Sequence, residues 1–277
     1  NRARVTSAVN DALIERGEYD HFMLKEIHEQ PESLARSIVP YIDQKSQTIE
    51  VNQVAADIFA KADRAVAIAC GTAYYAAFTA KYWFESLAGL PCEIDVASEF
   101  RYREPPLEAN GLSLFISQSG ETADTLAALR HCKANGQTIA VVVNVPTSSM
   151  AREADLLLPT HAGPEIGVAS TKAFTCQLAV LAALAAHMAV KKGRLTRDEE
   201  AEIVRHLLEA PAALNAALAH DDDIAAMAHL VAPARDVLYL GRGQDYPLAL
   251  EGALKLKEIS YIHAEGYAAG EMTHGPI

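Results

Sequence analysis

Cysteine is scarce in this sequence of 277 residues. Its four cysteines, Cys70, Cys92, Cys132 and Cys176, lie at least 22 residues apart, so none belongs to a CxxC pair, and no histidines are paired at metal-ligand spacing. This spacing gives no support to a disulfide framework or a zinc site. We expect reduced, largely buried thiols in a cytoplasmic protein that uses no metal and no cofactor.

Basic residues and long hydrophobic runs are also in short supply. The chain has 24 Lys and Arg against 36 Asp and Glu, and its longest basic run is the pair Lys191 and Lys192. A net charge of −12 argues against nucleic-acid binding, so an anionic ligand would need local donors. Residues 178–190 are Ala-rich, contain His187 and are too few to span a bilayer, so we expect a buried helix and no membrane partner.

Short apolar runs alternate with helical patterns through the middle of the chain. Continuous apolar strands of this kind are typical of a parallel sheet covered on both faces. The sequence therefore predicts an α/β fold, a doubly wound three-layer sandwich of five strands that ends in a long helix over residues 171–190. The expected strands are residues 66–69, 94–97, 112–116, 139–143 and 156–159.

The two flanks of this unit have mainly helical patterns. Before it we expect a helix that starts near Pro31, a turn over residues 43–48 and a helix over 51–61. After it we expect helices over 197–229, broken near Pro211 and again at the aspartates 221–223. The predicted division is a leader over 1–50, a first domain over 51–195 and a partial second domain over 196–277.

The second domain repeats the start of the first. Residues 64–72 match residues 235–243 at an offset of 171, which places Tyr75 on Tyr246 and indicates a duplicated unit. Only one clear strand is visible in the second copy, and 37 residues follow Leu240. Because half a sheet cannot bury both faces, we expect the chain to be a fragment whose remainder carries further strands.

Residues 117–122, Ser-Gln-Ser-Gly-Glu-Thr, separate the third strand from a helix over 123–133. A turn of this kind is either an anion site, because free backbone N–H groups and the helix dipole point at it, or an ordinary N-cap. Hydroxyls also occur at two further helix starts, Thr72 and Ser170 with Thr171. Ligands of open α/β sheets bind beyond the carboxyl ends of the strands, which favours a binding site.

A charged stripe and a histidine are the candidates for proton transfer. Glu251, Lys255 and Glu258 have the spacing i, i+4 and i+7, so they share one helix face, which is either solvated or lines a cavity. His274, before Gly275 in a segment expected to be a loop, is either a turn residue or a proton carrier. The third glycine of a dinucleotide fingerprint and a phosphate loop ending in Lys-Ser or Lys-Thr are both missing, so neither nicotinamide nor ATP chemistry is indicated.

Six stretches carry a more specific pattern: residues 70–72, 82–89, 98–103, 117–122, 165–174 and 251–276. Together they resemble the isomerase part of the glutamine-fructose-6-phosphate aminotransferases, or glucosamine-6-phosphate synthases, a family built from two sugar isomerase (SIS) domains. The resemblance covers most of the chain from about Phe22. It implies two SIS domains, fructose 6-phosphate as substrate, glucosamine 6-phosphate as product and a homodimer.

The resemblance also implies roles for individual residues. The sugar phosphate would be held by Ser117, Gln118, Ser119 and Thr122, and the rest of the sugar would contact Thr72, Val168 and Ser170. Glu258 would move the proton between the first two sugar carbons with Lys255 assisting, and His274 would open the sugar ring in the site of a neighbouring subunit. A carboxylate and an imidazole suit these proton transfers.

Three departures from the family are visible. Ala73 stands where members often have a serine. The family's glutaminase domain, a partner in the full-length chain, would precede residue 1, so residues 1–50 would link to it. The family's carboxyl-terminal tail, which carries the lysine that forms a Schiff base with the sugar, would lie beyond Ile277. We therefore expect this fragment to be inactive alone. Two alternatives stay open, a non-catalytic sugar-phosphate-binding regulatory module and a related amino-sugar-phosphate deaminase or isomerase.

Overall fold

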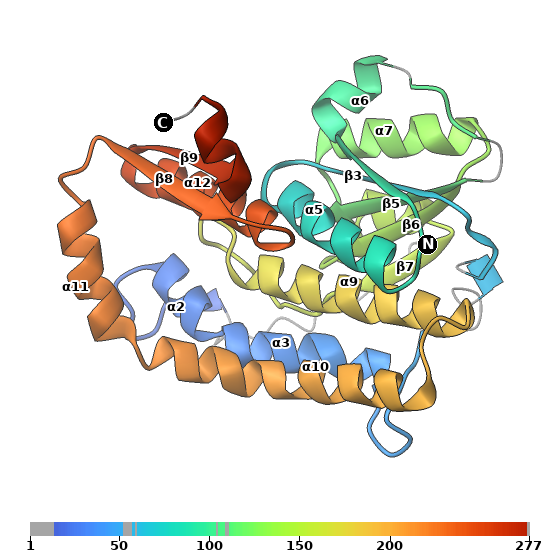
Figure 1. Cartoon of the computed structure of the whole chain (residues 1–277), viewed down its shortest axis with the longest axis horizontal. Coiled ribbons are helices and arrows are strands. Elements are labelled where there is room, and N and C mark those ends of the chain that lie inside the picture. The colour runs from blue at the N-terminus through green and yellow to red at the C-terminus, as the bar shows by residue number, and fades with distance from the viewer. Residues whose placement is uncertain (1–13, 52–56, 59, 104, 109–110, 276–277) are drawn as a thin grey trace, which may run out of the picture.

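A five-stranded parallel sheet forms the centre of the chain (Figure 1). The computed structural model describes residues 14–51, 57–58, 60–103, 105–108 and 111–275. Every pair of neighbouring strands in the sheet is parallel, in the order β4-β3-β5-β6-β7. The strands are β3 (Ala65–Ala69), β4 (Cys92–Val96), β5 (Leu112–Ser117), β6 (Thr138–Val143) and β7 (Leu156–Pro159), so the predicted five-stranded sheet is confirmed.

Helices cover both faces of this sheet. Alternate strand residues belong to separate cores: Leu114 and Val142 lie in one, and Phe115 and Val141 lie in the other. The first core is covered by α5 (Gly71–Ser86) and α9 (Lys172–Lys191). The second is covered by α6 (Ala97–Arg103), α7 (Ala123–Ala134) and α8 (Ser149–Glu153). The expected three-layer sandwich is therefore confirmed.

Small residues allow α5 and α9 to pack closely. Ala76, Ala77 and Ala80 on α5 are at most 1% exposed, and the alanines of α9 face the same core. By length and composition α9 could cross a membrane, but 72% of it is buried inside the protein. It is the buried core helix that the sequence predicted.

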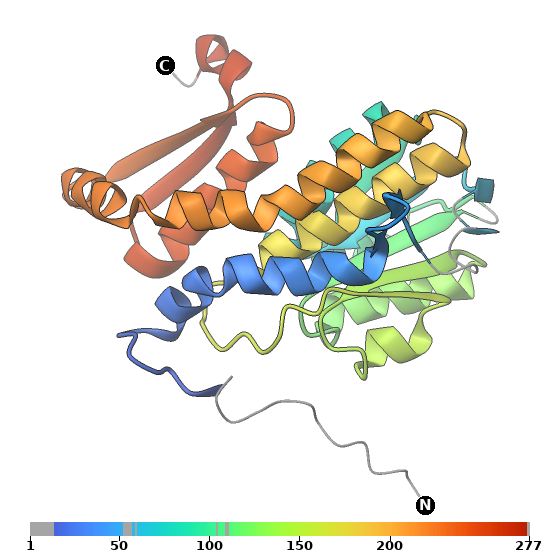
Figure 2. The same cartoon turned by 90° about the horizontal axis from the view of Figure 1, so that it is seen from below.

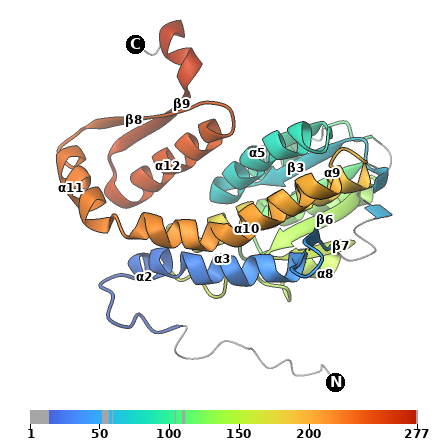
Figure 3. The same cartoon turned by 60° about the horizontal axis from the view of Figure 1, so that its bottom comes forward.

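The segment before the sheet packs against its helical layer. It contains α2 (Phe22–His28), α3 (Gln30–Ile38), the 3-10 turn η1 (Val39–Tyr41) and the hairpin of β1 (Ile42–Asp43) with β2 (Thr48–Ile49). Pro31 lies in the first turn of α3, as expected. Figures 2 and 3 show α3 beside α9 and α10 (Arg197–Leu218). Of the helix expected over 51–61, residues 52–56 and 59 lie outside the described part, and 57–58 and 60–61 are helical.

The expected break near Pro211 is wrong. Helix α10 continues through this proline to Leu218, and α11 (Asp221–Val231) follows it. A proline removes one helical hydrogen bond, but tertiary packing supplies most of the stability of a helix. The amino-terminal half of α10 is held by a capping box between Thr196 and Glu199 and by Val204, which is fully buried.

The second unit has two strands where the sequence reading found one. Strand β8 (Asp236–Gly241) runs into α12 (Asp245–Ser260), then into β9 (His263–Ala268) and η2 (Ala269–His274). The sequence of β9 contains Glu265 and Gly266 and lacks the apolar run that indicates a strand. Within the described residues, β8 and β9 pair only with each other.

The strand pairing supports the internal repeat, and the side of the sheet that each residue faces corrects its register. Ala65 pairs with Cys92 in the first unit and Asp236 with His263 in the second, an interval of 27 residues in both. An offset of 171 would align Ala67, which faces α5, with Leu238, which is 46% exposed. It is the neighbouring Tyr239 whose ring lies against α12. The repeat is therefore shifted by one residue on the strand, because successive strand residues face opposite sides.

Close packing of α5 on α9 predicts intolerance to added volume. We expect Ala80→Leu to lower the free energy of unfolding by about 1–3 kcal/mol, because a tightly packed core has no room for three more carbons. Ala213→Leu, on the exposed face of α10, is the matched control and should change it by less than about 0.5 kcal/mol. Urea unfolding of both variants measures the difference, and equal effects would contradict close packing.

Candidate functional site

A cavity of about 220 Å³ lies at the carboxyl ends of β3 and β5. These two strands are neighbours in the sheet, but the chain leaves β3 for β4 on the opposite side. Ligands of doubly wound sheets bind at such a reversal of strand order. The volume is below the roughly 300–1,000 Å³ of pockets for drug-sized ligands, which suits a small ligand. The lining residues are Cys70, Thr72, Ala73, Ile116, Ser117, Gln118, Ser119, Thr122, Thr125, Ser170 and Gln177.

The turn after β5 folds around its own hydroxyls. The backbone N–H of Gly120 donates to Ser117 Oγ at 2.9 Å, and that of Glu121 donates to Ser119 Oγ at 3.2 Å. Gly120 has φ +67°, and a Cβ there would lie 2.1 Å from Ser148 Oγ, so only glycine fits. Thr122 is the N-cap of α7, but its side chain makes no capping hydrogen bond. An ordinary N-cap therefore does not explain this hydroxyl, which lines the cavity at a helix N-terminus.

The helix start at Ser170 is different, because a carboxylate already occupies it. Glu165 Oε1 accepts from the backbone N–H groups of Thr171 and Ala173 at 2.9 and 3.1 Å. Its other oxygen accepts from the Ser170 hydroxyl at 2.9 Å. Helix α9 is thus capped from within the chain, and Ser170 reaches the cavity as a single polar group and not as part of an anion cradle.

The charged stripe of α12 meets the cavity at Thr72. Lys255 Nζ donates to Thr72 Oγ1 at 2.8 Å, and that hydroxyl donates to Glu251 Oε1 at 3.0 Å. Lys255 also pairs with Glu258 at 2.7 Å and with Glu251 at 3.4 Å. Four proton-carrying groups therefore form a continuous chain beside the cavity, and the sequence alternative of a solvated stripe is wrong for Glu251, which is 5% exposed.

The buried carboxyl of Glu251 is poised to change its protonation state near neutral pH. Burial raises the pKa of Glu251 to about 7, although the charge of Lys255 and the hydrogen bond from Thr72 both favour the ionised form. Its Oε2 is buried and has no hydrogen-bond partner among the residues that the structure describes. A carboxyl with a pKa in this range can accept and return a proton at physiological pH.

Not every predicted site residue is gathered at the cavity. Val168 lies outside its lining and is 98% exposed, and His274 is exposed on η2, which projects away from the first sheet in Figures 2 and 3. Sequence reasoning missed Gln177, which is 2% exposed and lines the cavity. Its Oε1 has no hydrogen-bond partner within the described part of the chain. A glutamine at a buried position of an apolar helix was the available signal.

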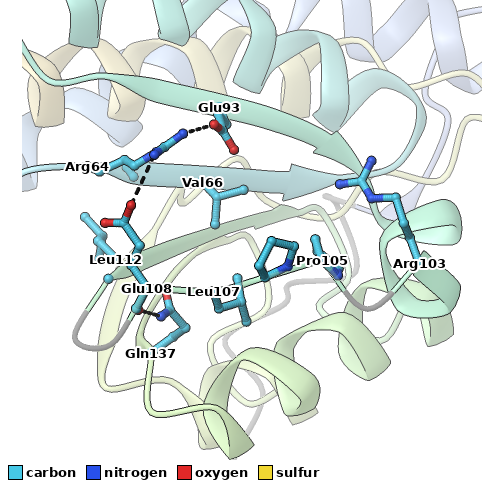
Figure 4. Close-up of a pocket in the computed structure, with 12 residues that line it drawn as sticks. Arg64, Val66, Glu93, Arg103, Pro105, Leu107, Glu108, Leu112 and Gln137 are labelled. Carbon is cyan, nitrogen blue, oxygen red and sulfur yellow. Dashed lines mark hydrogen bonds and ion pairs between the residues drawn. The ribbon is translucent and has the colours of Figure 1, made fainter.

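A larger cavity of about 540 Å³ lies at the amino ends of the strands, away from this chemistry (Figure 4). Its two arginines are already paired, Arg64 with Glu93 and Glu108, and Arg103 with Asp95. The smaller cavity at the carboxyl ends is therefore the candidate site.

The chain is similar to known proteins along its length. The family model for the SIS domain matches residues 58–187 and 230–277. Glutamine--fructose-6-phosphate aminotransferase [isomerizing] from Zymomonas mobilis subsp. mobilis is 66% identical over 276 residues, and that from Bradyrhizobium diazoefficiens is 56% identical. Each alignment covers 100% of this chain and 45% of the relative, so the chain spans less than half the length of these curated relatives.

A solved structure gives the same relationship. The C-terminal domain of glucosamine-fructose-6-phosphate aminotransferase from Francisella tularensis superimposes with a TM-score of 0.91 at 44% identity. The match covers 95% of this chain and 73% of that one.

The free hydroxyl of Thr122 predicts that binding and stability separate at this residue. We expect Thr122→Val to weaken inorganic phosphate binding about tenfold, the value of one hydrogen bond to a charged group, with little loss of stability. Thr196→Val is the matched control, because Thr196 caps α10 and its loss should cost about 1 kcal/mol without affecting phosphate. Calorimetric titration and urea unfolding give both values. A loss of stability without a loss of binding in Thr122→Val would restore the N-cap interpretation.

The raised pKa of Glu251 predicts a pH-dependent stability. The folded protein holds this proton up to about pH 7, whereas the unfolded chain releases it near the ordinary carboxyl pKa. The contribution is therefore fully present below the unfolded pKa and is lost as the pH rises from there through about 7, by on the order of 3 kcal/mol.

Glu251→Gln should remove this component. As the pH rises from 5 to 8, the unmodified protein should lose stability relative to the variant. Urea unfolding at both pH values measures the two free energies of unfolding. Glu202→Gln, at an exposed carboxylate of α10, should give a difference that is nearly constant with pH. A constant difference for Glu251→Gln would disprove the raised pKa.

Proposed function

This chain belongs to the SIS-domain family, in the group of the C-terminal domain of glucosamine-fructose-6-phosphate aminotransferase, and on that premise we propose that it converts fructose 6-phosphate toward glucosamine 6-phosphate. In this proposal it is the isomerase part of a longer aminotransferase. Ammonia would come from a glutaminase domain of the full-length protein.

The position of Thr72, between the cavity and the charged groups of α12, is the observation that supports the proposal. Its hydroxyl lines the same cavity as the Ser117–Thr122 hydroxyls and also bonds Lys255 and Glu251. A sugar phosphate with its anion at the turn would therefore extend toward the groups that can move protons. A pure anion-binding module has no need for a buried carboxyl–lysine pair, since burying such charges is costly without a task.

The proposed chemistry assigns one task to each group. The backbone N–H groups and hydroxyls of residues 117–122 hold the phosphate at the start of α7. Glu258 carries the proton between the first two carbons of the open sugar, and Lys255, held between two carboxylates, fixes the orientation of Glu258. The Oε1 atom of Gln177 accepts a hydrogen bond from a sugar hydroxyl, which would satisfy its unpaired state.

The proposed role of His274 needs a second subunit. The exposed position of His274 suits a residue that reaches the cavity of a partner, so we propose a homodimer in which His274 opens the sugar ring across the interface. Val168 is 98% exposed in the loop that leads to Ser170. It would contact the sugar once the sugar occupies the cavity. Ala73 lines the cavity without a hydroxyl, so it would supply no bond to the phosphate. The domain limits at residues 51–195 and 196–277 and the cytoplasmic location stay predictions.

The catalytic role of Glu258 predicts a specific loss of turnover. In the natural full-length protein, Glu258→Gln should lower kcat for conversion of fructose 6-phosphate to glucose 6-phosphate by about 100-fold or more, because an amide cannot carry the proton. Glu209→Gln, at an exposed carboxylate of α10, is the control and should leave kcat unchanged. Full activity in Glu258→Gln would remove Glu258 from this role. An unmodified protein that binds fructose 6-phosphate without converting it would favour the regulatory module.

A further inference from the structure

Glu26 is a buried carboxylate that the proposed reaction does not use. It lies on α2, is 2% exposed, and its Oε1 accepts from the backbone N–H of Ile166 at 2.5 Å. Both of its oxygens accept from the N–H of Gly167 at 3.1 Å. A charged acceptor makes hydrogen bonds about twice as strong as a neutral one. Glu26 therefore fixes a loop that is 140 residues away in sequence.

The glycine at position 167 makes this contact possible. A Cβ there would lie 2.5 Å from Glu26 Oε2 and 3.3 Å from Met23 Cα, so the loop backbone sits directly against α2. Its φ lies outside the left-handed region, and the constraint is thus the close approach and not the backbone conformation.

A second contact joins the C-cap of α2, Glu29, to the start of α9. Lys172, the first residue of α9, is 3% exposed on its side chain and pairs with Glu29 at 2.6 Å. Glu29 also pairs with Lys25 at 3.1 Å. Breaking a buried ion pair is costly, because it leaves an uncompensated charge, so α2 and the start of α9 are held at a fixed separation.

The loop between these two contacts leads to the cavity. Ser170, at the end of this loop, lines the cavity, and its hydroxyl donates to Glu165. The loop is thus fixed on one side by Glu26 and on the other by Glu165, whose carboxylate caps α9. Helix α2 lies outside residues 58–187 and 230–277, which the SIS family model matches.

We propose that Glu26 is a positioning residue of the candidate site: its carboxylate fixes the backbone of Ile166 and Gly167 and thereby holds Ser170 at the cavity. The statement that a sugar phosphate benefits from this position rests on the proposed function. The segment before the sheet is therefore part of the site and not only a connection to it.

Amide hydrogen exchange tests the positioning directly and needs no substrate. In Glu26→Gln one acceptor oxygen becomes an NH₂ donor that faces backbone N–H groups, so exchange in the peptide covering Ile166 and Gly167 should rise at least about tenfold. Glu32→Gln, at an exposed carboxylate of α3, should leave that peptide unchanged. Unchanged exchange in Glu26→Gln, or an equal rise in the β6 peptides, would overturn the proposal.

Gly167→Ala disturbs the contact between Glu26 and the loop by a change in the loop itself. It serves as the test if Glu26→Gln does not fold. Its added Cβ should displace the carboxylate and raise exchange in the same peptide, whereas Glu26→Asp, which keeps the charge, should restore part of the protection. Equal exchange in Glu26→Asp and Glu26→Gln would show that the charge has no role and would contradict the proposal.

The link to substrate is tested in the natural full-length protein. Glu26→Gln should raise KM for fructose 6-phosphate about fivefold to tenfold and change kcat by less than about twofold, because a displaced loop weakens binding and leaves the proton-carrying groups in place. Faster exchange with an unchanged KM would disprove the link between loop and site. If the unmodified protein does not turn over fructose 6-phosphate, the proposed function fails, and the exchange measurement still decides the role of Glu26.

Discussion

The hydroxyl of Thr72 joins the two repeated units, and the rest of the site depends on this junction. Thr72 lies on α5, whereas its partners Lys255 and Glu251 lie on α12. A carboxyl as buried as Glu251 is destabilising unless polar groups compensate it. Lys255 does so from the same helix, and Thr72 does so from across the junction. The ring contact of Phe78 with Tyr246, with centroids 5.7 Å apart, lies between the same two helices. The hydrogen bonds that Thr72 makes at the site therefore form only when α12 packs on α5.

The central sheet and the turn after β5 could be predicted because both are encoded locally. Five short apolar runs, each bounded by a turn, leave a parallel sheet with two covered faces as the fitting arrangement. The position of residues 117–122 then follows, since every strand of such a sheet ends at the same edge. The charged stripe on α12 was also recognisable from spacing alone, and only its burial required the structure.

The features that the sequence did not indicate depend on contacts far apart in the chain. Strand β9 is stabilised by its pairing with β8 and by α12, and its own residues are weak strand formers. Helix α10 passes through Pro211 because its packing on α3 and α9 outweighs the local penalty. No spacing rule connects Glu26 to Gly167, which lies 141 residues away. In each case tertiary contact overrides local preference.

The three hydroxylated helix starts, which looked equivalent in sequence, differ in what they can bind. Glu165 already supplies the negative charge that the N-terminus of α9 attracts. At the start of α7, the side chain of the N-cap residue Thr122 makes no capping hydrogen bond within the described residues. Its hydroxyl lines the cavity and stays available to a ligand. Lys255 is shared between two carboxylates and is not a free counter-ion for phosphate. In a chain of net charge −12, an anion at this site would thus be held by backbone N–H groups and hydroxyls, and the charged groups of α12 would remain for the proposed proton transfer.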